Sequence, residues 1–257
     1  MPSIDLNADM GEGVGPWHMG ADAELLALVT SANVACGFHA GDPTIMRETA
    51  RAAHAHGVAL GAHPGLPDLV GFGRRELRIT PDEAHALVLY QIGALQAMAR
   101  AAGTRVGHVK PHGALYTMAA RDAALSEAIA RAVHDADPSL VLVGLADSET
   151  TRAGTRVGLR VAHEGFADRR YRADGTLVPR SAPDALLDEV HEAVAQATAL
   201  ATGAPIGTQD GAPRVIRCDT LCLHGDGPHA VAFARAIRTA LAAAGVDVAP
   251  LVSAPRA

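Results

Sequence analysis

The architecture is set by the stretch Ser31-Ala32-Asn33-Val34-Ala35-Cys36-Gly37-Phe38-His39-Ala40-Gly41-Asp42-Pro43, in which a short apolar run passes through a Gly-rich turn into a helix start. Asp42 followed by Pro43 is typical of an N-cap with proline at the first helical position, and predicts a helix to about His56. A second apolar run, Val58–Ala62, comes next. Strand, helix and strand in this order favour a parallel βαβ unit.

The same rhythm recurs along the chain. Short apolar runs, each expected to be a strand buried on both faces, cover Ser3–Ala8, Ser31–Cys36, Val58–Ala62, Val106–Val109, Leu140–Leu145, Leu159–Ala162 and Thr220–Leu223. Helices are expected over 42–56, 80–102, 123–135, 182–200 and 228–243, the second of them with a capping box at Thr80 and Glu83. Seven such strands predict an α/β fold, a parallel, TIM-like (β/α) barrel in one domain spanning residues 1–257. A doubly wound open sheet is the alternative.

The composition narrows the range of functions. The 257 residues carry a formal net charge of −6 with no basic run, which disfavours nucleic acid and anionic membranes as partners. No apolar stretch reaches the roughly 18 residues of a membrane span, and the first residues show no secretory signal. Three cysteines are too few for a disulfide framework, so we expect a cytoplasmic protein.

Polar residues of the types used in catalysis follow most of the expected strands. They are Asn7, Asp9 and Glu12 after the first, His39 after the second, His63 after the third, Lys110 and His112 after the fourth, His163 and Glu164 after the sixth, and His224 and Asp226 after the seventh. Because the carboxyl ends of parallel strands meet at one edge, we expect these side chains to share a pocket. Turns alone do not require repeated histidine, so the pattern indicates an enzyme.

The first strand carries Asp5, Asn7 and Asp9 at alternate positions, so all three side chains point to the same side of it. In a barrel that side faces the interior, where polar groups need partners or a ligand. We interpret Asn7 and Asp9 as site residues. Asp5 lies deeper and is interpreted as structural.

Two histidines, His39 and His63, have three interpretations: metal ligands, general acid or base groups, or hydrogen-bonded core residues. Together with Asp9 they would compose a carboxylate–His–His site for a divalent metal. No compact ligand motif such as His-Glu-x-x-His occurs, so a divalent metal stays an open alternative.

Lys110 is the only lysine among the 22 basic residues. A buried ammonium can change its pKa, whereas an Arg stays charged, so a lone Lys next to His112 favours a functional role as nucleophile, base or point charge. Two basic segments are candidate clamps for a carboxylate or phosphate. One is a loop around Arg74 that we expect to be mobile, and the other is the polar segment that contains Arg169.

Several motifs, taken together, resemble one known family. They are Asp5-Leu6-Asn7-Ala8-Asp9-Met10-Gly11-Glu12, the stretch from Thr30 to Pro43, Gly61-Ala62-His63-Pro64, Gly71-Phe72-Gly73-Arg74-Arg75, His108-Val109-Lys110-Pro111-His112-Gly113-Ala114-Leu115-Tyr116, Phe166-Ala167-Asp168-Arg169 and His224-Gly225-Asp226. In these motifs the chain resembles the LamB/YcsF family as far as about Gly245. It departs from the family pattern at Val14, Gly65 and Thr117, none of which is a main polar group.

The resemblance implies a seven-stranded barrel like those of glycoside hydrolases and deacetylases. It also implies an ATP-hydrolysing 5-oxoprolinase, which opens the cyclic amide 5-oxo-L-proline to L-glutamate with ATP as co-substrate and separate B and C subunits as partners. Phosphate activation makes chemical sense, because the five-membered lactam re-forms easily by an intramolecular reaction. No P-loop is present, so ATP would bind by other contacts or partly on the partners.

On this hypothesis, Lys110 and nearby Arg hold the substrate carboxylate or the developing phosphate charge. Asp9 and His112, with His39 or His63, move protons or position water. The residues expected to bind substrate or nucleotide are Asn7, Glu12, Arg74, Arg169, His224 and Asp226. Two rival functions are a stand-alone metal-dependent amide or carbohydrate deacetylase and a non-catalytic substrate-binding subunit.

Overall fold

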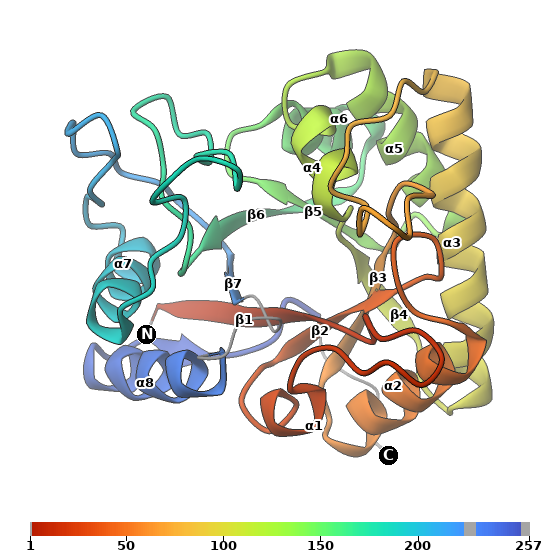
Figure 1. The fold of residues 1–257 in the computed structure, drawn as a ribbon, viewed down its shortest axis with the longest axis horizontal. Coiled ribbons are helices and arrows are strands. Elements are labelled where there is room, and N and C mark those ends of the chain that lie inside the picture. The colour runs from red at the N-terminus through yellow and green to blue at the C-terminus, as the bar shows by residue number, and fades with distance from the viewer. Residues whose placement is uncertain (1, 224–229, 253–257) are drawn as a thin grey trace.

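The computed structural model describes residues 2–223 and 230–252, in which parallel strands alternate with helices. The strands are β1 (Ser3–Met10), β2 (Ser31–Ala35), β3 (Ala59–His63), β4 (Val106–Val109), β5 (Val141–Leu145), β6 (Arg160–Phe166), β7 (Thr220–Leu223) and β8 (Asp247–Val248). The helices are α1 (Asp22–Leu25), α2 (Pro43–Ala55), α3 (Pro81–Ala101), α4 (Gly113–Ala119), α5 (Ala123–Ala136), α6 (Glu149–Val157), α7 (Val190–Thr202) and α8 (Ala230–Ala243). Figure 1 shows the strands around the centre and the helices outside them.

The sheet closes on itself. Its strand order is β2-β3-β4-β5-β6-β7-β1, and β1 pairs with β2 as well, so seven strands complete a ring. The strand pairs are parallel, with Asn7 of β1 beside Ser31 on one side and Cys222 on the other. The predicted seven-stranded parallel barrel is therefore confirmed, and the open sheet is wrong. The two-residue strand β8, which was not predicted, pairs only with the start of β1.

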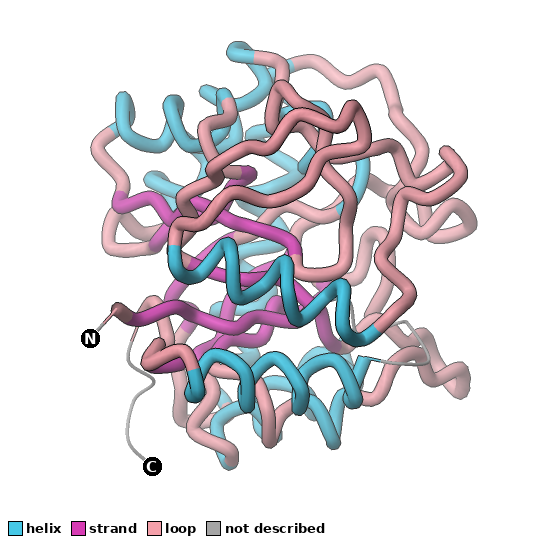
Figure 2. The backbone as a smooth tube through the Cα atoms, turned by 90° about the vertical axis from the view of Figure 1, so that its left-hand side faces the viewer, coloured by secondary structure: helices cyan, strands magenta, loops and turns pink. Residues whose placement is uncertain are grey.

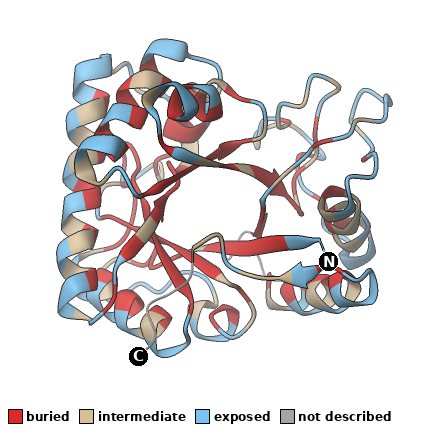
Figure 3. Ribbon diagram, turned by 180° about the vertical axis from the view of Figure 1, so that it is seen from behind, coloured by how far each residue is buried: buried red, intermediate tan, exposed pale blue. Residues whose placement is uncertain are grey.

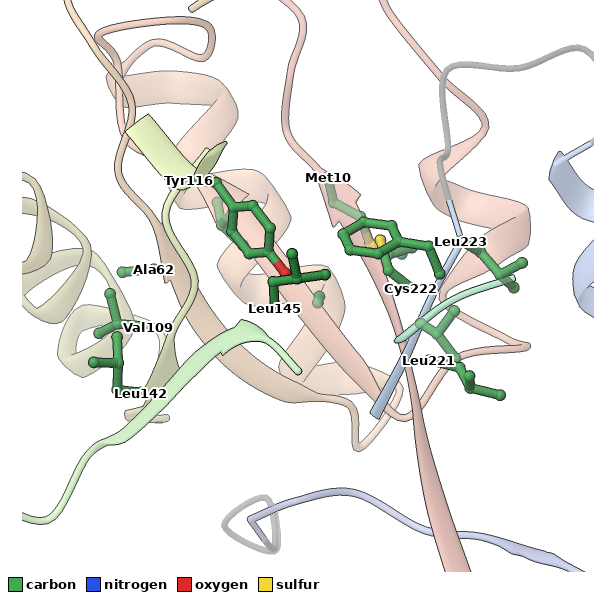
Figure 4. Packing of buried hydrophobic residues seen from close by; sticks show 14 of the residues in the cluster. Met10, Ala62, Val109, Tyr116, Leu142, Leu145, Leu221, Cys222 and Leu223 are labelled. Carbon is green, nitrogen blue, oxygen red and sulfur yellow. The ribbon is translucent and has the colours of Figure 1, made fainter. Parts of the chain in front are cut away.

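Apolar side chains fill the space between the barrel and its helices. Ala62, Val109 and Leu142 come from three neighbouring strands, are paired in register and lie side by side in Figure 4. Figure 3 shows that burial concentrates on the strands and on the helix faces turned toward them. Burying one such aliphatic side chain stabilises a fold by about 1.5–3 kcal/mol, so this layer is the main source of stability.

The end of the barrel at which the strands begin has its own small apolar plug. Val141, Val143 and Ala162 form a separate cluster, against which Leu251 and Val252 pack. These two residues follow β8 and carry the chain across that end of the barrel. The opposite end, where the strands finish, is left to polar groups. In Figure 2, β1 runs from the labelled N-terminus toward a side of the molecule that is rich in loops.

Two helix starts confirm the predicted capping signals. The Asp42 carboxylate accepts hydrogen bonds from the backbone N–H groups of Thr44 and Ile45. Thr80 and Glu83 exchange side-chain and backbone hydrogen bonds as a full capping box before Pro81. These contacts satisfy N–H groups that have no partner within the helix, and so fix where α2 and α3 begin.

The structure differs from the prediction in the later helices. The helix expected over 182–200 begins only at Val190, because Leu186 forms an antiparallel bridge with Arg169 and the preceding segment pairs with that loop. Helices α1, α4 and α6 were not predicted. In α6, a Cβ on Gly154 would lie 2.6 Å from Cγ1 of Val161, so the glycine that weakens the helical signal lets the helix sit close to the sheet. Within residues 2–223 and 230–252, every helix is too short or too polar to cross a membrane.

The barrel interior should not tolerate a side chain at Gly61. A Cβ there would lie 2.1 Å from Nε2 of His108, inside the ring of strands. We expect Gly61→Ala to lower the free energy of unfolding by about 1–3 kcal/mol through overpacking, as measured by urea denaturation.

Gly93 on α3 provides the matched control. It is exposed, and a Cβ there meets no atom within 4 Å. Gly93→Ala should leave stability unchanged or raise it by up to about 1 kcal/mol, because alanine favours the helix. A Gly61→Ala protein as stable as the wild type would contradict the packing described here.

Candidate active site

Side chains at alternate positions of β1 form a column of polar groups inside the barrel. At its lowest level the Asp5 carboxylate accepts hydrogen bonds from the hydroxyls of Thr30, Ser31 and Thr220. Burial raises the pKa of Asp5, although these hydrogen bonds act in the opposite direction. The carboxylate is buried and its hydrogen bonds join β1 to β2 and β7, which agrees with a structural role for Asp5.

At the next level, the amide of Asn7 joins β1 to three other strands, and the amide of Asn33 extends the network to a fourth. Nδ2 of Asn7 donates to Oγ1 of Thr220 at 2.7 Å and to Oε1 of Glu164 at 3.1 Å. Its Oδ1 accepts a hydrogen bond of 2.7 Å from Nδ2 of Asn33. Nε2 of His108 donates to Oδ1 of Asn33 at 2.9 Å, so the network reaches β4. All five side chains are buried, and the network therefore fixes the orientation of each amide.

Lys110 follows β4 and its ammonium is buried above this level, with 3% exposure. Nζ lies 2.9 Å from Oδ1 of Asp9, 3.0 Å from Oε1 of Glu164, 3.2 Å from Oδ1 of Asn7 and 3.1 Å from Sγ of Cys222. Burial by itself would lower the pKa of Lys110, but the negative charges of Asp9 and Glu164, with the hydrogen bond to Cys222, outweigh it and hold the pKa well above its usual value. Burial also raises the pKa of the Cys222 thiol, which stays neutral. This environment suits a point charge rather than a nucleophile or base.

Asp9 connects the lysine to a group of histidines. Its Oδ1 contacts Lys110, while its Oδ2 lies 3.3 Å from Nε2 of His63. Nδ1 of His112 is 2.9 Å from the same His63 nitrogen and 3.4 Å from Oε1 of Glu12. The Glu12 oxygen is in turn 3.3 Å from Nε2 of His39. The Asp9 carboxylate thus links the residues around Lys110 to the group of histidines, and these two clusters come from different strand ends.

Two glycines and one amide shape the space around His39 and His112. The two rings stack with centroids 3.7 Å apart and an interplanar angle of 3°. A Cβ on Gly65 would lie 2.4 Å from Nδ1 of His39, and one on Gly73 would lie 2.7 Å from its Cβ, so larger residues would displace the ring. The buried amide of Gln91 accepts a hydrogen bond from the N–H of Gly65 and donates one to its carbonyl. Burial lowers the pKa of both histidines well below the usual value, as do neighbouring histidine rings.

The loop around Arg74 is held in place by several contacts, although we expected it to be mobile. Arg75 pairs with the buried carboxylate of Asp68. The Phe72 carbonyl accepts a hydrogen bond of 2.9 Å from Nε2 of His112. The Arg74 guanidinium lies 4.8 Å from the centre of the Phe72 ring. These contacts hold the loop against the histidines.

A cavity of about 900 Å³ opens over the two clusters. Its walls include Asp9, Glu12, His63, Lys110 and His112, together with Arg74, Arg121, Arg152, Arg169, Arg172, Arg180 and Arg214. Arg169 is 6% exposed and donates to the Val178 carbonyl. Burial, with Arg180 nearby, lowers the pKa of Arg169 to about 10, still far above neutrality. A cavity of this size suits a drug-sized ligand, and its arginines suit an anion.

The structure brings most of the predicted site residues together. Asn7, Asp9, Glu12, His39, His63, Lys110 and His112 form the connected clusters, and Arg74 and Arg169 lie in the cavity wall. The open alternative for a metal was Asp9 with His39 and His63, and the structure also gathers Glu12, His39, His63 and His112, whose ligand atoms lie within 4.8 Å of one another. His224 and Asp226 fall outside the described residues.

Sequence reasoning missed other members of the polar interior. Glu164 was placed just after the sixth strand among the polar residues expected in the pocket but was given no role, whereas β6 continues to Phe166 and buries its carboxylate completely. Asn33 and His108 lie within apolar runs and were not singled out as site residues. A polar side chain inside a short buried strand is the signal that would have found all three, because such a group needs a partner in the barrel.

A closed parallel barrel with buried polar groups at its strand ends defines a class of β/α-barrel proteins. A polysaccharide deacetylase from Bacillus cereus, Bc1974, shares this fold at a TM-score of 0.50, with 15% identity over 98% of this chain and 93% of that one. The chain belongs to the LamB/YcsF family, whose model matches residues 4–256. The resemblance seen in the motifs is therefore confirmed.

Two relatives are much more similar. The 5-oxoprolinase A subunit of Methylococcus capsulatus is 61% identical, with the match covering 97% of this chain and 96% of the relative. The solved structure of a lactam utilization protein from Thermus thermophilus superposes with a TM-score of 0.91. It is 48% identical, with the match covering 97% of this chain and all of that one.

The buried histidine beneath Lys110 should make stability depend on pH. Burial, with Lys110 and His63, lowers the pKa of His108 from 6.5 to about 3 in the folded protein. Below pH 6.5 the unfolded chain binds a proton at this residue that the native state refuses, so stability falls as the pH falls. His108 alone should remove about 2 kcal/mol of unfolding free energy between pH 7 and pH 5.

Urea denaturation at both pH values checks this in the wild type and in His108→Gln, whose amide can still donate to Asn33. The variant should lose about 2 kcal/mol less than the wild type over the same pH interval. An equal loss in the two proteins would mean that His108 is not held neutral in the barrel.

Proposed function

We propose that this chain carries the lactam-cleaving site of an ATP-dependent 5-oxoprolinase and acts with separate B and C subunits. The names of similar proteins, a 5-oxoprolinase A subunit and a lactam utilization protein, support this assignment. The observation that carries it is the Lys110 ammonium, held by Asp9 and Glu164 below a cavity lined with arginines. Such a floor suits a small anionic substrate whose carbonyl oxygen gains negative charge during reaction.

The proposed reaction converts 5-oxo-L-proline, ATP and two water molecules into L-glutamate, ADP and phosphate. The lactam oxygen attacks the γ-phosphorus and ADP leaves. Water then adds to the activated carbon, the ring C–N bond breaks, and the nitrogen takes up a proton. A second water releases phosphate from the resulting acyl phosphate. Activation of this kind is needed because the open product otherwise recloses by an efficient intramolecular reaction.

In this reaction Lys110 acts as a fixed positive charge beside the lactam oxygen or the phosphate. Its contact with Sγ of Cys222, at 3.1 Å, is to the weakest of its four acceptors. A substrate oxygen would replace that thiol without breaking the ion pairs to Asp9 and Glu164. The positive charge therefore remains neutralised before and after the substrate binds.

Proton movement is assigned to the histidines that meet Asp9. His63 lies 3.3 Å from Oδ2 of Asp9 and 2.9 Å from His112, so a proton has a short path between them. All three residues line the cavity. Burial, with the rings of His39 and His63, holds the pKa of His112 well below its usual value, so its imidazole is neutral at the start of the reaction.

The outer part of the cavity is assigned to the nucleotide. Its volume, about 900 Å³, exceeds what a small lactam fills. Arg172, Arg180 and Arg214 stand in the same wall as the buried Arg169. Because the sequence has no P-loop, we propose that this wall, with the partner subunits, holds the phosphates of ATP.

All three cysteines are free thiols, which fits the cytoplasmic location that we propose.

A stand-alone metal-dependent amide hydrolase is the second candidate. Glu12, His63 and His112 favour it, because they present facing acceptor atoms at a cavity floor. The two candidates differ in their requirements. Glutamate formation from 5-oxoproline by the chain alone, without ATP, would support this second candidate over the first.

Replacing Lys110 with Met removes the charge and keeps much of the side-chain volume. In a complex reconstituted from this chain and purified B and C subunits, Lys110→Met should lower kcat/KM for glutamate formation by at least about 100-fold. Arg131→Met on α5 is the control, since Arg131 is exposed and pairs with Glu127 of the same helix. It should retain wild-type activity.

Loss of the ammonium leaves two buried carboxylates without their cation, so folding must be checked by circular dichroism. The double variant Lys110→Met with Glu164→Gln removes one of those charges and should recover stability without recovering activity. Full activity in a folded Lys110→Met protein would refute the proposed role.

A further inference from the structure

The group of Glu12, His39, His63 and His112 has an arrangement that the proton path through His63 and His112 does not explain, and it points to a second role for these nitrogens that replaces proton transfer while an ion is bound. The four side chains are buried, and one ligand atom of each lies within 4.8 Å of the others. They reach the barrel mouth from four separate strand ends, those of β1, β2, β3 and β4. Helix capping does not explain why these side chains converge, because none of the four caps a helix with its side chain.

Backbone carbonyls determine where the protons lie on two of the rings. Nδ1 of His63 is 2.7 Å from the Lys110 carbonyl, and Nε2 of His112 is 2.9 Å from the Phe72 carbonyl. A carbonyl oxygen can only accept, so each of these nitrogens carries the ring N–H. The remaining nitrogens, Nε2 of His63 and Nδ1 of His112, therefore present lone pairs in the neutral rings.

These lone pairs point at each other and at carboxylates. Nε2 of His63 and Nδ1 of His112 are 2.9 Å apart, with Oδ2 of Asp9 3.3 Å from the first and Oε1 of Glu12 3.4 Å from the second. Electron-rich atoms at these distances repel one another unless a cation lies between them. In a histidine that binds a metal, the nitrogen that does not face the metal carries the N–H. Its hydrogen bond to a backbone carbonyl orients the other nitrogen toward the metal.

Three of the six distances within the group are close to those of a metal site, and the others lie within 4.8 Å, so the side chains would have to close slightly around an ion. Bonds of about 2.0–2.1 Å at tetrahedral angles put ligand atoms about 3.3 Å apart. The corresponding distances here are 2.9 Å for His63 to His112, 3.4 Å for His112 to Glu12 and 3.3 Å for Glu12 to His39. Nδ1 of His39 is buried without a hydrogen-bond partner among the described residues, so no hydrogen bond fixes which of its ring nitrogens carries the proton. Nε2 of His39 is therefore available as a ligand.

We propose that Glu12, His39, His63 and His112 bind one divalent transition-metal ion with the preference of a zinc site. Three imidazoles and one carboxylate are ligands that zinc accepts in tetrahedral geometry. Asp9 is left outside the set because its other oxygen is engaged by Lys110, so it orients His63 from the side. When bound, such an ion polarises a carbonyl oxygen or activates a water molecule.

The test measures binding on the chain alone, with neither 5-oxoproline nor ATP present. The protein is stripped with a chelator and titrated with Zn²⁺ against a chromophoric competitor, and separately with Co²⁺. We expect one equivalent of each metal, and visible Co²⁺ absorption of the intensity typical of four-coordinate sites. Metal analysis of the purified protein before it is stripped should show a divalent transition metal, at up to one equivalent per chain.

Variants locate the site. His63→Gln and His112→Gln should each weaken Zn²⁺ binding at least 10-fold and abolish the four-coordinate Co²⁺ spectrum. Glu12→Gln, which keeps the shape of the side chain, should weaken binding similarly and serves if a histidine variant does not fold. His85→Gln is the matched control, because His85 lies on α3 and pairs with Asp135 far from the cavity.

Two results would overturn the proposal. One is the absence of stoichiometric Zn²⁺ and Co²⁺ binding by the folded wild type. The other is binding that survives unchanged in folded His63→Gln, His112→Gln and Glu12→Gln proteins, which would locate the metal elsewhere. Neither result bears on the glutamate assay of the reconstituted complex, so the metal site and the proposed 5-oxoprolinase function fail separately.

Discussion

A single buried ammonium determines how the interior of this barrel is built. Lys110 is almost inaccessible to water, and an unpaired charge in such a place would be lost by deprotonation or would unfold the protein. Asp9 and Glu164 supply the opposing charge, and Asn7 orients one of them while accepting from the lysine itself. The polar column on β1 follows from this requirement. Each level satisfies hydrogen-bonding groups of the level above it.

The same arrangement separates the two ends of the barrel. One end is closed by Leu251 and Val252 against strand residues, so it contributes stability. The other end holds the charged groups and the cavity, where Asp9 links Lys110 to His63. The residues proposed for charge stabilisation and for proton movement thus lie next to each other, as the proposed reaction at a carbonyl group requires. Loops build much of the wall, together with the first turns of α4 and Arg152 of α6, and leave room for a large ligand.

Much of the fold could be predicted because its signals are local. The apolar runs gave β4 and β7 with their observed bounds, and Thr80 with Glu83 gave the start of α3. The site was predictable to the extent that its residues follow strands, as His39, His63, Lys110 and His112 do. The linear sequence does not show which side chains contact each other across the barrel. Glu164 was therefore missed as a partner of Lys110, and residues before Val190 were given to a helix.

The central claim, that 5-oxoproline is opened at the strand ends of this chain, has one most direct test. It is a crystal structure of the chain grown with 5-oxoproline, compared with one of a folded Lys110→Met protein grown the same way. The account predicts the lactam beside Nζ of Lys110, on the side of Cys222, with its carboxylate toward Arg169. A lactam bound away from this cavity, or bound identically in the variant, would contradict it.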